Sequence, residues 1–110
     1  MPESYLDLTR HFLEGHDYRV TCCSGLRFDF LVAAIHGGEI EPGTAEIAEE
    51  ITARHFGLYV FEGMLPGEAG EAGEAYARLH ITSHQFDEPR FVDFAGRHSH
   101  VITIHGCANG

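Results

Sequence analysis

The sequence has few basic residues, few cysteines and no long apolar run, and each of these shortages argues against a class of structure or function. Seven basic residues stand against seventeen acidic ones, a formal net charge of −10. Phosphate backbones are repelled by such an excess, so binding to DNA or RNA is not expected. No apolar stretch approaches the roughly 20 residues of a membrane-spanning helix. The N-terminal segment lacks the basic start and apolar core of a secretory signal, which favours a cytoplasmic location.

The three cysteines do not predict a disulfide framework, because their number is odd and two of them are adjacent. Cys22 and Cys23 fall in a β-like run, where neighbouring side chains point to opposite faces, so the pair cannot easily chelate one ion. We expect these two residues and Cys107 to be reduced, partly buried thiols.

Histidine, in contrast, is abundant. Nine of the 110 residues are histidines, and a neutral imidazole nitrogen binds divalent metals, so the excess favours a metal site. The apolar fraction of 44% is enough to bury one core in a chain of this length. We therefore expect residues 1–110 to form a single domain.

Apolar periodicity and turn signals predict an α/β fold, with a mixed or mostly parallel sheet and flanking helices. The segment from residue 28 to 61 has the order strand, loop, helix, strand, which is a βαβ unit. Repeated Gly-Glu-Ala at 67–75 predicts a flexible acidic surface loop. The expected helices are 4–13, 44–55 and 89–97, and the expected strands are 18–23, 28–35, 58–61, 78–82 and 100–104.

Polar residues follow three of the expected strands. His36 follows the strand at 28–35, Glu62 follows the strand at 58–61, and His105 follows the last strand. Ligands of α/β sheets bind beyond the carboxyl ends of the strands. This arrangement predicts an active site at one edge of the sheet.

The loop that begins at His36 has the composition of a zinc site. An imidazole and a carboxylate such as Glu41 can both bind zinc at about 2.0–2.2 Å, and the two glycines after His36 leave space for a tight bend. Glu39 is an alternative to Glu41, because HxxE spacing is also used for zinc. His105 is the third candidate, and three protein ligands leave a position for water, as in catalytic sites. The competing interpretation is a strand-to-helix turn with incidental polar residues.

His80 and Arg90 are candidates for substrate binding. His80 lies in an expected strand and is either a hydrogen-bonded core residue or a pocket residue near the metal. Arg90 can form a bidentate pair with a substrate carboxylate. It can equally form a structural salt bridge with Asp87 or Glu88, and we favour that role.

Several separated strings of the chain together resemble the poly-γ-glutamate hydrolase family, in the same order and over nearly the whole length. That family includes phage enzymes and bacterial proteins labelled phage-related replication proteins. The strings are His36-Gly37-Gly38, Ile40-Glu41-Pro42-Gly43-Thr44, Leu58-Tyr59, Phe61-Glu62-Gly63, Leu79-His80-Ile81-Thr82-Ser83, Phe86-Asp87-Glu88-Pro89 and Ile104-His105-Gly106.

The resemblance implies a zinc peptidase of carboxypeptidase-like fold that cleaves γ-glutamyl amide bonds. The zinc ligands it implies are His36, Glu41 and His105, which favours Glu41 over Glu39. Family members continue well beyond the HG motif and carboxypeptidase-like enzymes take their general base from that later region. We therefore expect a chain truncated at its C-terminus, or a natural short form. In that case, Glu62 at the pocket edge is the candidate for the general base.

Three functions follow from these expectations. The first is a zinc hydrolase acting on γ-linked glutamate chains or related anionic peptides. The second is an inactive zinc-binding fragment or module of the same family. The third is a replication protein, but the sequence has no basic patch that would support binding to DNA. No nucleic acid or membrane partner is expected, whereas truncation would expose a sheet edge and favour self-association.

Overall fold

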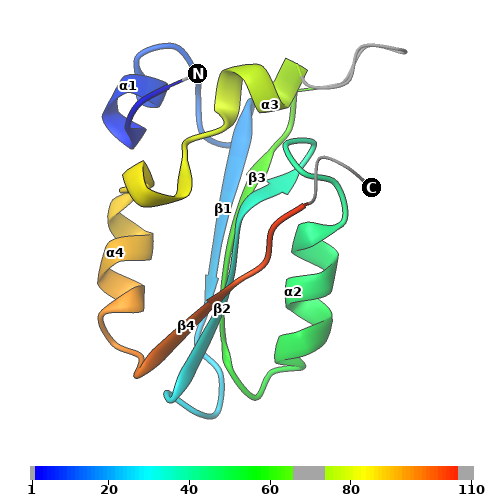
Figure 1. Ribbon diagram of the computed structural model, residues 1–110, viewed down its shortest axis with the longest axis vertical. Coiled ribbons are helices and arrows are strands. Elements are labelled where there is room, and N and C mark those ends of the chain that lie inside the picture. The colour runs from blue at the N-terminus through cyan, green and yellow to red at the C-terminus, as the bar shows by residue number, and fades with distance from the viewer. Residues whose placement is uncertain (1, 66–73, 107–110) are drawn as a thin grey trace.

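A four-stranded mixed sheet is the centre of the computed structural model, which describes residues 2–65 and 74–106. Its strands lie in the order β1-β3-β2-β4 (Figure 1). Strand β2 (Phe30–Gly38) runs parallel to both β3 (Gly57–Gly63) and β4 (His100–Thr103). Strand β1 (Tyr18–Cys23) is antiparallel to β3. The predicted α/β sheet is therefore confirmed, with three parallel strands whose carboxyl ends share one edge.

Helices cover both faces of the sheet (Figure 1). Helix α2 (Thr44–Thr52) packs on one face, where Ala45 and Ala48 meet Val32, Ala34 and Val60. The other face is covered by α1 (Tyr5–Thr9), α3 (Glu74–Leu79) and α4 (Pro89–Ala95), whose buried side chains join Leu31, Ala33, Ile35, Tyr59 and Phe61. Because β2 is buried on both sides, it is a nearly continuous apolar run. The 3₁₀ helix η1 (Ser83–Gln85) lies between α3 and α4 in the chain.

All three predicted helices end earlier than expected, and α4, expected at 89–97, ends at Ala95. Helix α1 is capped by the Ser4 side chain, as expected, but ends at Thr9 rather than at residue 13. Helix α2 ends at Thr52, because Ala53 and Arg54 adopt positive φ angles of 42° and 71°. Left-handed residues cannot continue a right-handed helix, so the chain turns here into β3.

The strand predicted at 78–82 is wrong. Residues through Leu79 belong to α3, and His80 lies in the connection that follows. Ala75 and Leu79, four residues apart, both join the core, which is helical spacing. The Gly-Glu-Ala repeat concealed the start of this helix. Residues 66–73 of the predicted acidic loop lie outside the described residues.

The cysteines of β1 differ from their expected burial. Burial decreases along this edge strand, and both Cys22 and Cys23 are exposed free thiols. The expectation of partly buried thiols is therefore wrong for these two, and Cys107 lies outside the described residues.

None of the helices in the described part of the chain is long and apolar enough to cross a membrane.

At the opposite edge of the sheet, no strand of the described residues pairs with the outer side of β4. All four residues of β4 are exposed, including Val101 at 40% and Ile102 at 43%. This strand pairs with β2 along one side. The expected exposed sheet edge is therefore present, and self-association through it stays a prediction.

A buried carboxylate, Glu88, joins α4 to the sheet. It accepts hydrogen bonds from the Tyr59 hydroxyl at 2.8 Å and from Arg90 Nε at 2.9 Å. The same guanidinium reaches Glu14, in the segment after α1, at 2.7 Å. Of the two roles that the sequence allowed for Arg90, the structure shows the structural ion pair: its guanidinium binds the carboxylates of Glu88 and Glu14.

The Arg90–Glu14 pair predicts an acid-sensitive part of the stability. The hydrogen bond from Arg90 lowers the pKa of Glu14 below its ordinary value of 4.5. A lowered carboxyl pKa adds stability above about pH 4.5 that is lost as the pH falls through the folded-state value. Glu14→Gln should therefore destabilise the protein at pH 7 by roughly 0.2–1 kcal/mol and much less at pH 3. Urea denaturation at both pH values measures this difference.

The matched control is Glu50→Gln, at an exposed position of α2. It should leave the unfolding midpoint unchanged at both pH values. An equal loss for Glu14→Gln at pH 7 and pH 3 would contradict an electrostatic origin.

Candidate metal centre

A β-bulge at the end of β2 directs His36 into the site. Ala34 pairs with Val60 and Gly37 pairs with Glu62, so β2 has one residue more than β3 over this stretch. An extra residue interrupts the alternation of side chains between the two faces. Ile35 therefore packs in the core cluster that contains Ile81, and the next residue, His36, bonds to the Ile81 carbonyl. Bulges of this kind commonly re-aim a side chain beside a functional site.

The hydrogen bonds of His36 define which nitrogen is free. The side chain is 2% exposed, and its Nε2 lies 2.6 Å from the carbonyl oxygen of Ile81. A carbonyl only accepts, so Nε2 carries the proton and a neutral His36 has its lone pair on Nδ1. That Nδ1 lies 3.3 Å from Oε1 of Glu41.

Glu41 is held by the backbone of the loop between β2 and α2. Its N–H donates to the His36 carbonyl at 2.8 Å, and its own carbonyl accepts from the Thr44 hydroxyl at 2.9 Å. Gly38, at φ 63°, allows the chain to turn, because a Cβ there would collide with the carbonyl oxygen of Gly63. The Glu41 side chain is thereby directed back towards His36.

His105 reaches the same carboxylate from the segment after β4. The Gly106 N–H donates to Glu41 Oε1 at 3.0 Å, and His105 Nδ1 lies 3.8 Å from that oxygen. The ring centroids of His105 and His36 are 5.3 Å apart. A Cβ on Gly106 would lie 3.1 Å from Glu41 Cβ, so glycine permits this close approach. The three residues predicted as ligands thus lie around one carboxylate oxygen, and their role as a ligand set stays a prediction.

A fourth residue, His80, lies against this cluster. Its ring is stacked between Tyr76, at a centroid distance of 4.2 Å, and His36, at 3.9 Å. Burial, followed by the neighbouring His36, lowers the pKa of His80 below its ordinary value. Its Nδ1 is buried and has no hydrogen-bond partner among the described residues. His36, Glu41 and His80 each offer a ligand atom, and these atoms lie within 4.8 Å of one another.

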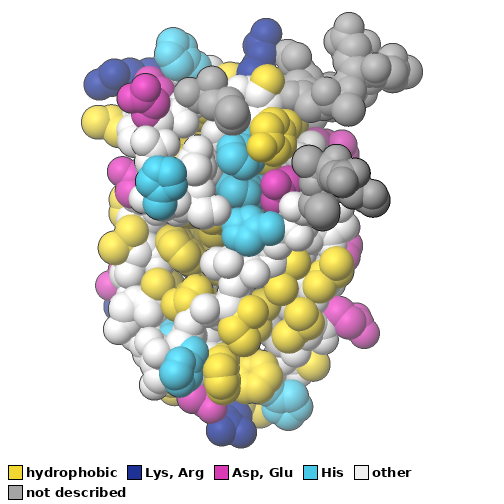
Figure 2. Space-filling view, viewed as in Figure 1, with side chains coloured by type: hydrophobic (Ala, Val, Ile, Leu, Met, Phe, Trp, Pro, Cys, Tyr) yellow, Lys and Arg dark blue, Asp and Glu magenta, His cyan; other side chains and the backbone are white. Residues whose placement is uncertain are grey.

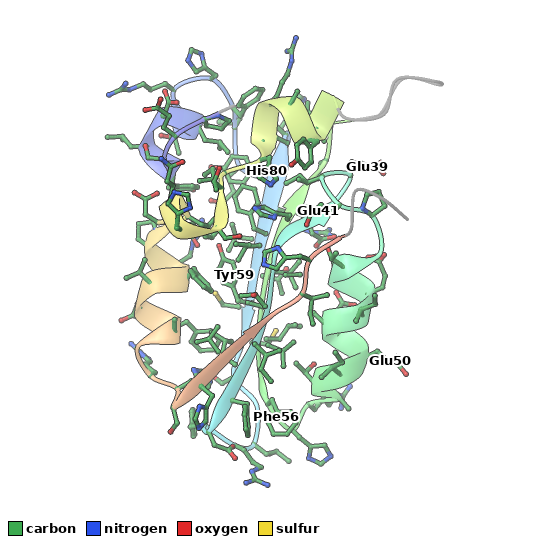
Figure 3. All side chains as sticks on the ribbon, in the orientation of Figure 1. Glu39, Glu41, Glu50, Phe56, Tyr59 and His80 are labelled. Atoms are coloured by element: carbon green, nitrogen blue, oxygen red, sulfur yellow. The ribbon has the colours of Figure 1, made fainter. Side chains whose placement is uncertain are left out.

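The histidines of the site share one region of the molecular surface. Figure 2 shows a row of histidine side chains with an acidic side chain beside it, at the upper centre of this face. Figure 3 labels His80 and Glu41 in the same region, His80 from the segment after α3 and Glu41 from the loop after β2. Glu39 is labelled at the outer side of that loop, away from the cluster. The structure therefore favours Glu41 over Glu39 as the carboxylate of this site.

The donor set of the cluster fits a divalent cation. His36 Nδ1 and Glu41 Oε1 face each other at 3.3 Å although both are acceptors when His36 is neutral. A cation between or beside them satisfies both lone pairs. Imidazole nitrogen with carboxylate oxygen is the donor chemistry of catalytic zinc sites. The backbone carbonyl on the other nitrogen is the outer partner that metal-bound histidines usually have.

Two predicted residues have other partners. Glu62 accepts hydrogen bonds from Arg19 Nε and Nη2, at 3.3 and 3.0 Å. Among the described residues, no hydrogen bond or ion pair joins its side chain to the histidine cluster. Arg90 is bonded to Glu14 and Glu88. The geometry supports neither a general base at Glu62 nor a substrate-binding guanidinium at Arg90.

Sequence reasoning placed His80 on a strand and so missed its stacking with Tyr76. An aromatic residue four positions before a histidine is helical spacing. That signal was present in the sequence, but the low-complexity repeat before it concealed the helix.

Comparisons with known proteins agree with this arrangement. The sequence model of the family described as Poly-gamma-glutamate hydrolase matches residues 3–110. UPF0714 protein YndL of Bacillus subtilis (strain 168) is 47% identical over 78 residues, which are 71% of this chain and 28% of YndL. SPbeta prophage-derived UPF0714 protein YoqZ of the same strain is 42% identical over 80 residues, 72% of this chain and 26% of YoqZ.

Two solved structures share the fold. A bacteriophage poly-gamma-glutamate hydrolase has a TM-score of 0.77 at 28% identity, and a zinc-free YndL has 0.76 at 38%. Each similarity covers 92% of this chain and 45% of the other chain. The chain thus spans less than half the length of these structures and under a third of the curated relatives.

The cluster predicts which of two neighbouring carboxylates binds metal. Glu41→Gln should weaken zinc binding by at least about tenfold, because it removes the charged oxygen that faces His36 Nδ1. Glu39→Gln is the matched control, since Glu39 is exposed in the same loop, and it should bind zinc as the wild-type chain does. Competition with a chromophoric chelator measures both affinities. Equal losses in the two variants would exclude Glu41 as the specific ligand.

Proposed function

The chain belongs to the poly-gamma-glutamate hydrolase family, and from that premise we propose that it forms the metal-binding part of a zinc-dependent hydrolase of γ-glutamyl amide bonds. One observation carries the proposal. His36, from the end of β2, and His105, from the segment after β4, both approach the oxygen Glu41 Oε1. Two imidazoles and one carboxylate are a ligand set of catalytic zinc sites.

Each residue of the cluster has a role in this proposal. His36 presents Nδ1 because Ile81 holds its other nitrogen, and Glu41 contributes its charge. His105, with its side chain 35% exposed, is the ligand from the sheet edge: its Nε2 hydrogen-bonds to Thr103 Oγ1 and its Nδ1 faces Glu41. When bound, zinc supplies a Lewis acid that polarises the scissile carbonyl and activates water. The YndL structure is described as zinc-free, which supports zinc as the metal of the family.

The substrate proposed is an anionic peptide with γ-linked glutamates. His80, predicted from the sequence to bind the substrate, lies beside the cluster with its Nδ1 buried and without a partner among the described residues, and its contact with the substrate stays a prediction. Glu41 is acidic and no lysine or arginine contacts it among the interactions of the described residues, so the bound metal would supply the positive potential at the site. A chain of charge −10 repels polyanions at long range, and cleavage should therefore depend on ionic strength.

Metal binding without turnover is the second candidate function. It is favoured by the pairing of Glu62 with Arg19, which leaves the general base without an assigned residue in the described part of the chain. Binding to DNA, the third interpretation of the sequence, has no support in the charge of the protein.

Zinc analysis combined with a hydrolysis assay distinguishes these functions. The wild-type chain should bind one zinc and shorten poly-γ-glutamate, and a chelator should abolish the cleavage. His105→Ala should lose both properties, whereas His16→Ala, at a side chain that is 80% exposed, should keep both. One bound zinc without any release of glutamate oligomers would refute the hydrolase and leave the binding module.

A further inference from the structure

The two histidines beside His36 are oriented differently towards it. The rings of His36 and His80 are stacked, with centroids 3.9 Å apart and planes at 26°. The rings of His36 and His105 are 5.3 Å apart and inclined at 57°. The ligand atoms of His36, Glu41 and His80 lie within 4.8 Å of one another, which would admit His80 as a ligand, but the ring separation and orientation do not.

An imidazole binds a metal through a lone pair in the plane of its ring. An ion about 2.0–2.1 Å from the nitrogen lies roughly 3.2 Å from the ring centre, so two imidazoles at a tetrahedral angle have centres about 5 Å apart. The His36–His105 pair has this separation. An ion bound to His36 Nδ1 lies near the plane of the His36 ring. A ring stacked on His36 has its lone pairs in its own, nearly parallel plane, so they point past that ion and not at it.

We propose that His80 is a positioning residue that holds the metal-binding ring of His36 by stacking, and not a metal ligand. The inference rests on the proposed metal centre and assigns this role within it. Tyr76 covers the far face of His80, so His80 is clamped between two rings. The adjacent carbonyl, that of Ile81, binds His36 Nε2. One short segment after α3 thus controls both the plane and the tautomer of His36.

This double support has a physical reason. His36 lies at a bulge and is followed by two glycines, so the local backbone does little to restrict its ring. The hydrogen bond fixes one nitrogen, but rotation about the line of that bond would still swing Nδ1 away from Glu41. The flat face of His80 opposes this rotation. A preorganised ligand loses less entropy on binding, and loss of such outer support typically weakens metal affinity by about 10–100-fold.

Replacing the nitrogen while keeping the flat ring separates the two roles. His80→Phe can stack but cannot ligate, whereas His80→Ala can do neither. We expect zinc affinity within about threefold of wild type for His80→Phe and a loss of about 10–100-fold for His80→Ala. The Co²⁺ absorption bands of His80→Phe should match those of the wild-type chain, because the ligand set is unchanged. Chelator competition and Co²⁺ titration need no turnover.

His84→Ala, at an exposed position in the nearby η1, is the control and should retain wild-type affinity. Urea denaturation of the metal-free variants separates loss of fold from loss of the site, and His80→Leu replaces His80→Ala if the latter fails to fold. Equal losses in His80→Phe and His80→Ala, or altered Co²⁺ bands in His80→Phe, would show a ligand and overturn the proposal. Unchanged affinity in both His80→Ala and His80→Leu would also overturn it.

The proposed function fails in a different way. A wild-type chain that binds zinc without cleaving poly-γ-glutamate refutes the hydrolase but leaves the affinities of the His80 variants decisive for the positioning role. A wild-type chain that binds neither zinc nor Co²⁺ refutes both.

Discussion

The hydrogen bond from His36 Nε2 to the Ile81 carbonyl is the interaction on which the candidate metal centre depends. It is 2.6 Å long and joins residues 45 positions apart. It fixes the tautomer of His36 and so directs the lone pair of Nδ1 towards Glu41. The carbonyl is itself placed by the burial of Leu79 and Ile81, both at most 1% exposed, in the core beneath α3. The geometry of the site is therefore a consequence of how that helix packs.

The parallel arrangement of β2, β3 and β4 explains why distant residues meet at one carboxylate. Their carboxyl ends lie at one edge, and the bulge in β2 turns His36 towards the segment that follows α3. Glu41 Oε1 then lies near two imidazoles and one backbone N–H. A half-buried carboxylate in an acidic protein is costly unless positive charge or donors surround it. A bound cation would supply that charge where the donors converge.

His105 is the least enclosed member of the cluster, because it follows an edge strand whose residues are all exposed. His36, in contrast, comes from a central strand covered on both faces. The site thus combines a rigid half, formed by His36, His80 and the β2–α2 loop, with a half that depends on the open edge of the sheet. The two candidate imidazole ligands, His36 and His105, thus differ in structural support although their donor chemistry is the same.

Residue type and order by themselves predicted the βαβ unit and the N-termini of α2 and α4. They also indicated His36 and His105 as candidate ligands, whereas the choice of Glu41 over Glu39 came from the family resemblance. Buried strands, helix starts and strand-end ligands leave local signals in composition and spacing. The helical state of residues 74–79 was not recognised, because the repeat before it carries no periodicity. The partners of Arg90 and Glu62, and the stack of His80 on His36, were decided by tertiary structure alone. They depend on which surfaces pack together across the sheet, and no local pattern of residues contains that information.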